Sequence, residues 1–421
     1  MKAGKALQQK RRKSDGLQGV RLTHSTPRRE SRSHGEGVSK VMQLVKETLS
    51  GHEGLEVTMQ TSLRGIAEKA ARDKTYRFRN LFGLLNVGFL LWCWNFLKKK
   101  SASGVDRVTA SQYSADLKGN ITRLVERVKG GAYRAKLVLR RFIPKTGGKQ
   151  RPLGIPATED KLLQTGVTKI LEAIYEEDFF PCSFGYRPGI GALDAVKDLS
   201  NNLQFKGYNF IVEADIKSFF DKIEHDKLLD MLRKRIDDRP FLGLIQKWLK
   251  AGILVEDMVI HPITGTPQGG IVSPILANIY LHNAVDMWFE EVVKRHCHGV
   301  SYICRYADDF VCAFQYEDDA EWFYNALGIR LKEFGLEVAE AKTAMMRFSR
   351  LYMEDKNSFE FLGFEFRWGK NRAGNAQLLK RTSRKKLRNS LVNFNDWCKK
   401  SRNRRLKDLF KELRNQDFII P

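Results

Sequence analysis

Two adjacent carboxylates, Asp308 and Asp309, interrupt a run of β-favouring and largely apolar residues between positions 301 and 314. The aromatic and β-branched side chains on both sides predict a hairpin with the two aspartates at its tip. Without a glycine beside the pair, the turn signal is not of the strongest kind. Two like charges in half-buried surroundings need a cation or a base to compensate them. A solvated acidic turn is the plainer interpretation of an isolated pair. A metal site becomes the better interpretation only if the sequence offers further carboxylates.

The charge of the chain is the second constraint. The 421 residues include 73 Lys plus Arg against 49 Asp plus Glu, which gives a formal net charge of +24. This excess goes far beyond solubility and predicts a polyanionic partner, with nucleic acid ahead of an acidic membrane surface. No stretch reaches the roughly 18 uninterrupted apolar residues of a membrane-spanning helix. The nearest, residues 81–97, carries Asn86 and Asn95 and predicts a buried helix, so we expect no membrane partner.

Cysteine usage and the first residues bear on the cellular compartment. The six cysteines show no C-x-x-C spacing, which predicts reduced structural thiols, a cytosol-like compartment and no zinc site. Residues 1–37 are basic and poor in acidic and apolar side chains. They predict a disordered basic tail, with a mitochondrial transit peptide as the alternative. A bacterial type of cytoplasm is therefore the expected location, and the mitochondrial matrix is the alternative.

The order of predicted elements divides the rest of the chain into three regions. Residues 38–135 have helical periodicity and form an N-terminal extension. Residues 136–368 follow the order strand, helix, strand-turn-strand, helix, strand, which indicates an α+β domain with an antiparallel sheet. Residues 369–421 are again strongly basic and predict two helices of a separate small domain.

A further carboxylate, Asp215, follows the short β run at residues 210–214. Two Mg²⁺ ions about 3.5 to 4 Å apart require carboxylates from different chain segments, completed by phosphate oxygens. Asp215 and the Asp308–Asp309 pair could supply such a set if their strands are neighbours. The residues alone therefore leave two interpretations open, a two-metal phosphoryl-transfer enzyme and a solvated acidic turn.

Several sequence blocks resemble the motifs of one polymerase family. Tyr306-Ala307-Asp308-Asp309 resembles the YADD box of reverse transcriptases, and the other blocks occur in the order of that family, in particular of its group II intron-encoded branch. These blocks are Gly104-Val105-Asp106, residues 143–145 with 151–156, residues 183–189, residues 213–221, residues 265–270 with 273–278, and Phe361-Leu362-Gly363-Phe364. The resemblance covers roughly residues 61–411.

The fold that this resemblance implies is a right-hand polymerase. Residues 136–368 would form the fingers and palm, and residues 369–421 would form part of the thumb, or X (maturase), domain. The implied reaction is the RNA-templated addition of deoxynucleotides to a 3′-hydroxyl. The implied partners are an RNA template, a DNA primer, dNTPs and intron RNA.

The resemblance also assigns roles to the carboxylates. Asp215 and Asp308 would ligate two Mg²⁺ ions, and Asp309 would lie close by and shape the site. A hydrogen-bonded structural role is the alternative for Asp309.

Four further residues would hold the incoming nucleotide. Lys145 and Arg151 would bind the triphosphate, since a lysine offers a point charge and an arginine a bidentate fork. Phe220 would exclude a 2′-hydroxyl, and Gln268 with its glycine neighbours would let the backbone approach the template and the nascent pair. The plainer alternatives are surface charges, a core phenylalanine and a tight turn.

Two more positions complete the implied site. Lys342 would protonate the leaving pyrophosphate, and a solvated lysine is the alternative. The run Phe361-Leu362-Gly363-Phe364 would grip the primer, or would simply be a core strand.

The last residues depart from the family pattern. Members usually continue past a segment like residues 406–413 into a further basic helix with a G-x-x-x-Y-Y-type motif, whereas this sequence ends at Pro421. The expectation is therefore a C-terminally truncated thumb and no endonuclease segment. Two rival functions follow: an RNA-binding maturase without polymerase activity, and a host-adapted reverse transcriptase acting in defence.

Overall fold

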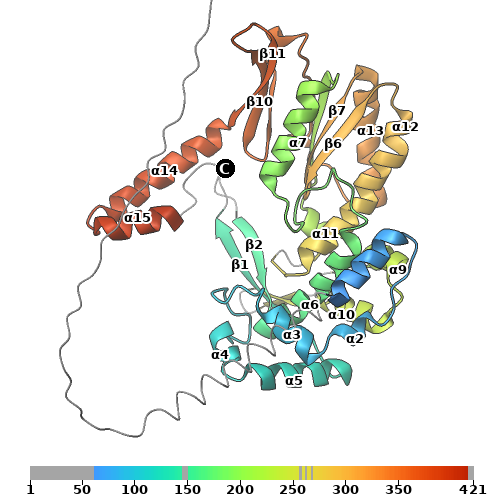
Figure 1. Ribbon diagram of the computed structural model, residues 1–421, viewed down its shortest axis with the longest axis vertical. Helices are drawn as coiled ribbons and strands as arrows, with labels where there is room; N and C mark the ends of the chain where they lie inside the picture. Colours follow the sequence, from blue (N-terminus) through green and yellow to red (C-terminus); the bar gives the residue numbers. More distant parts are fainter. Residues whose placement is uncertain (1–60, 145–149, 256–257, 261–262, 267–268, 416–421) are drawn as a thin grey trace, which may run out of the picture. The chain divides into compact units, whose positions relative to one another are not determined.

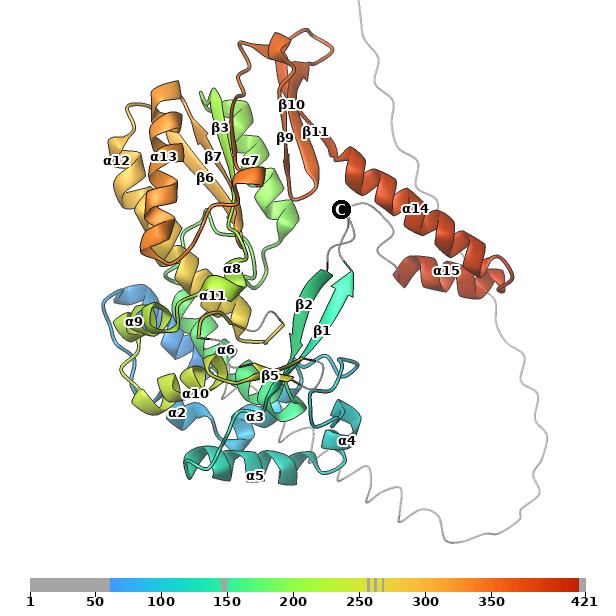
Figure 2. The same cartoon turned by 180° about the vertical axis from the view of Figure 1, so that it is seen from behind.

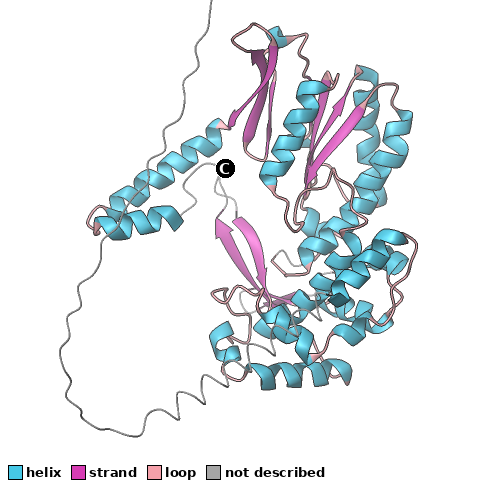
Figure 3. Ribbon diagram, in the orientation of Figure 1, coloured by secondary structure: helices cyan, strands magenta, loops and turns pink. Residues whose placement is uncertain are grey.

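A computed structural model describes residues 61–144, 150–255, 258–260, 263–266 and 269–415. These residues form three β-sheets surrounded by helices (Figure 1) (Figure 3). The predicted basic tail, residues 38–60 of the predicted extension, Lys145 and Gln268 lie outside the described residues. Within the described part of the chain, no helix combines the length and the apolar character needed to cross a membrane.

The central sheet is antiparallel, as the sequence predicts. Its four strands lie in the order β6 (Ser301–Tyr306), β7 (Asp309–Phe314), β3 (Phe210–Asp215) and β8 (Ala344–Arg347). Every neighbouring pair is antiparallel. Strands β6 and β7 are consecutive and form a hairpin, whereas β3 inserts beside β7 from nearly a hundred residues earlier in the chain. The inner strands β7 and β3 therefore each have a hydrogen-bonded neighbour on both sides.

The two faces of this sheet pack against different helices. Phe210, Val212 and Ala214 of β3 point to one face, where they join a large apolar cluster. Helix α13 (Glu317–Glu333) covers that face, and Figure 2 shows it from this side. Ile211 points the other way and packs in a second cluster with α7 (Ala192–Phe205), which Figure 1 shows beside β6 and β7. Both faces of the sheet are thus buried along most of its length.

A second sheet contains the hairpin of the predicted fingers. Its order is β2 (Gln150–Ile155), β1 (Val138–Pro144), β4 (Ile253–Val255) and β5 (Met258–Ile260). β1 and β2 are antiparallel, and β1 is parallel to β4. Helix α6 (Thr158–Tyr175) follows β2 directly and is buried over most of its length.

One helix expected from the sequence is divided in the structure. The single buried helix expected at residues 81–97 is divided into α2 (Leu81–Leu84) and α3 (Val87–Trp94). The division occurs because the side chain of Asn86 accepts a hydrogen bond from the backbone N–H of Phe89 and starts a new helix there. The other helices of this part are α4 (Ala110–Ser114), α5 (Leu117–Lys129), α9 (His225–Arg235) and α10 (Arg239–Leu249).

One long helical segment leads toward the central hairpin. It begins as α11 (Ser273–Leu281), continues through two π-helical stretches, η1 (His282–Asp286) and η2 (Phe289–Val293), and ends as α12 (Lys294–His296). The apolar pattern of the sequence gives no signal for the two π-helical stretches. π-Helical turns are rare and often lie at functional sites.

The third sheet extends further along the chain than the sequence indicates. It has the order β11 (Ala376–Thr382), β10 (Phe364–Lys370) and β9 (Ser358–Phe361). The region boundary expected between residues 368 and 369 thus falls inside β10. The two expected basic helices are present as α14 (Arg384–Ser401) and α15 (Leu406–Asn415).

Candidate active site

The three aspartates expected in the site meet at one end of the central sheet. Asp215, the last residue of β3, is the cross-strand partner of Asp309, the first residue of β7. Asp309 also pairs with Tyr306 at the end of β6, so the hairpin turn consists of Ala307 and Asp308. The hairpin is as predicted, but only one of the two aspartates lies in the turn. Two distant chain segments therefore present three carboxylates at one edge of the sheet.

A fourth carboxylate, Glu213, lies on the same face of β3 as Asp215, because side chains two residues apart on a strand point the same way. Its carboxylate accepts a 3.0 Å hydrogen bond from the backbone N–H of Glu360 in β9. Burial raises the pKa of Glu213 to about 7; this hydrogen bond opposes the rise and the Glu360 charge adds to it. Sequence reasoning gave Glu213 no role, although its spacing from Asp215 was visible.

The crowding of these carboxylates favours a cation. Burial raises the pKa of Asp309 to about 7, and the charges of Asp308 and Glu213 add to the rise. Carboxylate oxygens are the ligands that Mg²⁺ prefers, usually one or two of them completed by water and substrate phosphates. No three His, Cys, Asp or Glu side chains of the described residues converge as a ready-made metal cage. The donor set therefore fits Mg²⁺ bound together with a phosphate ligand.

Lys342 supplies a positive charge at these carboxylates. It ends the short 3₁₀ helix η3 (Glu340–Lys342), and its ammonium group forms an ion pair with the Asp215 carboxylate. The segment before it is attached to the end of β3, because the backbone N–H of Ala339 donates a 2.8 Å hydrogen bond to the carbonyl of Asp215. The side chain of Lys342 is 61% exposed. Lys342 thus combines a backbone attached to β3 with a largely solvent-exposed side chain.

The nucleotide side of the site is defined by Phe220, Tyr186 and Arg151. Phe220 lies in the short helix α8 (Phe219–Lys222) just after Asp215 and is buried, but its ring meets the half-exposed ring of Tyr186 edge-on at 6.3 Å. Burial raises the pKa of Tyr186, the Asp308 charge adds to this effect, and the Arg151 charge opposes it. Tyr186 therefore lies between the carboxylate turn and the hairpin that carries Arg151. Sequence reasoning assigned no role to Tyr186.

The loop before α11 connects Phe220 with the fingers hairpin. The backbone N–H of Thr266 donates a 2.8 Å hydrogen bond to the carbonyl of Phe220. Gly269 has a φ of +114°, and a Cβ there would lie 2.5 Å from the carbonyl oxygen of Gly154 in β2. Only glycine fits such a close approach at positive φ. The described residues on both sides of Gln268 are thus fixed against the elements that carry Phe220 and Arg151.

The four residues of the expected primer grip form the tight turn between β9 and β10. Phe361 is buried and pairs with Phe364, so the turn consists of Leu362 and Gly363, both at positive φ (+52° and +83°). The ammonium group of Lys386 in α14 donates a 3.1 Å hydrogen bond to the carbonyl of Leu362. The turn is therefore joined to the first helix of the C-terminal region.

An antiparallel sheet with helices on both faces, three carboxylates at one edge and a basic hairpin nearby is consistent with the fold of a template-directed polymerase. Residues 143–366 of the 421-residue chain match the family described as "Reverse transcriptase (RNA-dependent DNA polymerase)". The chain belongs to this family. Strands β2 to β9 and the three carboxylates lie wholly inside the matched residues.

Curated relatives agree with this assignment. The chain is 41% identical over 186 residues to the "Group II intron-encoded protein LtrA" of Lactococcus lactis subsp. cremoris, which covers 44% of this chain and 30% of the relative. It is 41% identical over 219 residues to the "Uncharacterized 91 kDa protein in cob intron" of Schizosaccharomyces pombe, covering 51% of this chain and 26% of the relative. It is 32% identical over 281 residues to "Protein YkfC" of Escherichia coli (strain K12), which covers 59% of this chain and 74% of the relative.

These matches confirm the resemblance to the group II intron-encoded branch. The chain spans only about a quarter to a third of the length of the L. lactis and S. pombe relatives.

Proposed function

We propose that this chain is an RNA-directed DNA polymerase of a group II intron, which extends a 3′-hydroxyl with dNTPs in the presence of Mg²⁺ and binds intron RNA to assist splicing and mobility. The observation that carries the proposal is the cross-strand pairing of Asp215 with Asp309 beside the Asp308 turn, inside the segment that matches the reverse transcriptase family. Strand ends that present carboxylates from two chain segments are what metal-dependent phosphoryl transfer requires.

In the proposed reaction Asp215 and Asp308 would hold two Mg²⁺ ions, which activate the 3′-hydroxyl and neutralise the leaving pyrophosphate when they are bound. Asp309 lies at the same edge of the central sheet and would help to set the shape of the metal site. The ammonium group of Lys342 already reaches the Asp215 carboxylate, so it would be close enough to the metal site to donate a proton to the leaving pyrophosphate. These roles divide charge stabilisation and proton transfer between two neighbouring segments of the palm.

Binding of the nucleotide and the primer would use the elements around this edge. Lys145 and Arg151 would hold the triphosphate from the fingers hairpin. Phe220 would close the space beside the sugar, with Tyr186 as its neighbour. The Leu362–Gly363 turn would hold the primer end, and its attachment to α14 would couple primer position to the C-terminal helices.

The RNA template, the DNA primer and the intron RNA would be gripped mainly through phosphates. The net charge of +24 and the basic helices α14 and α15 supply the cations for this. Phosphate-dominated binding weakens steeply with salt, since each neutralised phosphate releases counterions. A salt-independent affinity for RNA would contradict this part of the proposal.

Primer extension on an RNA template is the experiment that tests the proposed function. The protein is expected to extend a DNA primer with Mg²⁺, and Asp308→Asn is expected to abolish extension while RNA binding remains. Folded wild-type protein that binds RNA without extending a primer would overturn the polymerase assignment and favour an RNA-binding maturase.

A further inference from the structure

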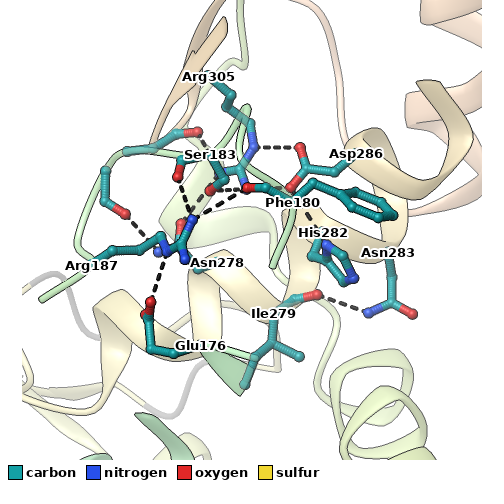
Figure 4. A network of polar contacts seen from close by, with 12 residues as sticks. Glu176, Phe180, Ser183, Arg187, Asn278, Ile279, His282, Asn283, Asp286 and Arg305 are labelled. Atoms are coloured by element: carbon teal, nitrogen blue, oxygen red, sulfur yellow. Dashed lines mark hydrogen bonds and ion pairs between the residues drawn. The ribbon is translucent and has the colours of Figure 1, made fainter. Parts of the chain in front are cut away.

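Arg305 is a fully buried arginine one residue before the strand end that leads into the carboxylate turn. It lies in β6, opposite Phe310 of β7, and both its side chain and its ion-pair partner Asp286 are 0% exposed. The Nε and Nη2 groups donate hydrogen bonds of 2.6 and 2.5 Å to the two oxygens of Asp286 (Figure 4). This is the bidentate geometry that makes arginine–carboxylate pairs strong and directional.

The same guanidinium group reaches the turn itself. Its Nη1 donates a 3.1 Å hydrogen bond to the carbonyl of Ala307, whose φ is +57°. That carbonyl belongs to the peptide unit that joins Ala307 to Asp308. A non-glycine residue at positive φ persists where its surroundings hold it in place. Arg305 therefore fixes the orientation of the peptide from which the Asp308 side chain departs.

All five N–H groups of Arg305 are used. Besides its three bonds to Asp286 and Ala307, it donates 2.7 Å to Ser183 Oγ and 3.2 Å to Asn278 Oδ1. A guanidinium has five donors in a rigid fork, whereas a lysine has three on one atom. A lysine at this position could not reproduce the set.

The partners of Arg305 come from segments that also contact the turn. The backbone of Arg305 exchanges 2.8 Å hydrogen bonds with the carbonyl of Cys182 and the N–H of Phe184. At Gly185, an added Cβ would lie 2.3 Å from the backbone nitrogen of Ala307. The Nδ2 group of Asn278 donates a 2.6 Å hydrogen bond to the carbonyl of Gly185. The turn is thus enclosed by backbone on one side and by the guanidinium on the other.

Asp286 is placed by the π-helical stretch η1, at its last residue. Burial by itself would raise the pKa of Asp286, but the charge of Arg305 and its hydrogen bonds, with His282 nearby, hold the pKa below its ordinary value. The carboxylate is therefore ionised and neutralises the buried guanidinium. A π-helical turn contains more residues than an α-helical turn, so a regular α-helix here would turn a different residue toward β6. The π-helical stretch is therefore needed to place Asp286 beside Arg305.

Stability alone is a weak reason for such a pair. A buried ion pair replaced by apolar residues of similar volume is often neutral or stabilising, whereas removal of one partner is strongly destabilising. What an apolar pair cannot supply is the hydrogen bond to the Ala307 carbonyl.

We propose that Arg305, oriented by Asp286, is a positioning residue that holds the Ala307–Asp308 peptide so that the Asp308 carboxylate is presented as a metal ligand. This rests on the proposed function, because it assigns the role to the same metal site. The consequence is that loss of Arg305 changes the metal requirement more than it changes the fold.

The test uses Arg305→Lys and the paired apolar variant Arg305→Met/Asp286→Leu, the second to guard against an unpaired buried charge. The matched control is Arg235→Lys, since Arg235 forms a largely buried ion pair with Asp178 but bonds only to residues remote from the turn. Thermal unfolding, RNA binding, Mg²⁺ titration of primer extension and Mn²⁺ binding in the presence of dNTP, followed by electron paramagnetic resonance, are measured for each protein.

We expect both Arg305 variants to bind RNA like wild type but to need on the order of 10-fold more Mg²⁺ for half-maximal extension and to bind Mn²⁺ correspondingly weakly. Arg235→Lys is expected to lose thermal stability without a change in metal dependence. The proposal is overturned if a folded Arg305 variant needs no more Mg²⁺ than wild type. It is also overturned if, in all variants including Arg235→Lys, the increase in the Mg²⁺ requirement is proportional to the loss of thermal stability.

The Mn²⁺ measurement separates this inference from the proposed function. A wild-type protein that binds Mn²⁺ at a site lost in Asp308→Asn, but does not extend a primer, would refute the polymerase and leave the positioning role supported by weaker binding in the Arg305 variants. A wild-type protein with no such Mn²⁺ site would refute the positioning role.

Discussion

The carboxylate of Glu213 and the backbone N–H of Glu360 form a 3.0 Å hydrogen bond that joins β3, the strand that ends at Asp215, to β9, one residue before the Phe361 end of the proposed primer-grip turn. β3 and β9 belong to different sheets, so this bond is a direct link between the carboxylate edge and the turn. The chemistry and the primer end would need to be held in one geometry for extension, since small displacements of reacting groups are costly in rate.

Glu213→Ala is expected to loosen this link, whereas Glu213→Gln keeps an oxygen that can accept the N–H of Glu360. We expect the alanine variant to lose about 0.5 to 1.5 kcal/mol of stability, the usual net contribution of one intramolecular hydrogen bond. Its KM for primer–template should rise several-fold, with the glutamine variant near wild type. Steady-state extension and thermal unfolding measure both effects, and equal primer KM values for the two variants would count against the link.

Strand patterns predicted the edge of the site well, because local apolar runs ending in an aspartate determine where β3 and β7 stop. The meeting of Asp215 with Asp309 then needed only that the two strands be neighbours. The burial of Arg305 could not be predicted in the same way. Its partner Asp286 is 19 residues away in sequence, and a π-helical register decides that Asp286 faces β6.

The third sheet shows a second limit of the sequence. β11 alternates only weakly between exposed and half-buried residues, and it pairs with β10 across a turn. The basic residues of β11 belong to the region for which the sequence predicts two basic helices, so the strand was not expected. The division at Asn86, by contrast, could have been predicted, since an asparagine before an apolar helix is a common N-cap.

Asp160, in the first turn of α6, provides a pH-dependent contribution to stability. Tyr133 Oη donates a 2.6 Å hydrogen bond to one oxygen of this carboxylate, and the N–H of Lys136 donates 3.1 Å to the other. Burial nevertheless raises the pKa of Asp160 to about 6, against the hydrogen bond from Tyr133. Because the folded state binds the proton more tightly than the unfolded state, this contribution to stability is present below about pH 4 and is lost as the pH rises through 6.

Asp160→Asn should remove that loss. The free energy of unfolding of the variant minus that of wild type should rise by about 2 kcal/mol between pH 4 and pH 7. This change is expected whatever the difference between the two proteins is at pH 4. Urea unfolding at several pH values measures the difference, with Asp396→Asn at an exposed position of α14 as the control. A difference between wild type and Asp160→Asn that does not change with pH would refute the assignment.

Phe220→Ala is expected to relax sugar selectivity. Removal of the ring would open the space beside Tyr186, and incorporation of ribonucleotides relative to deoxynucleotides should rise by about 10-fold or more. Because Phe220 is also buried, the variant should lose about 3 kcal/mol of stability. Phe219→Leu, at the adjacent buried ring, controls for core damage and should leave the selectivity unchanged. Selectivity that stays at the wild-type ratio in Phe220→Ala would make Phe220 a core residue only.

Lys342 can be tested as a proton donor with two replacements. Lys342→Met removes the ammonium group, and single-turnover nucleotide addition at saturating dNTP should slow by about 10². Lys342→Arg keeps the positive charge beside Asp215 but is a poor acid, since a guanidinium does not give up its proton in proteins. If Lys342 donates a proton, nucleotide addition should be slow in both variants. If Lys342 acts only through its positive charge, the arginine variant should add nucleotides at nearly the wild-type rate. Lys332→Met, at an exposed position of α13, controls for loss of surface charge, and a wild-type rate in Lys342→Met would exclude either role.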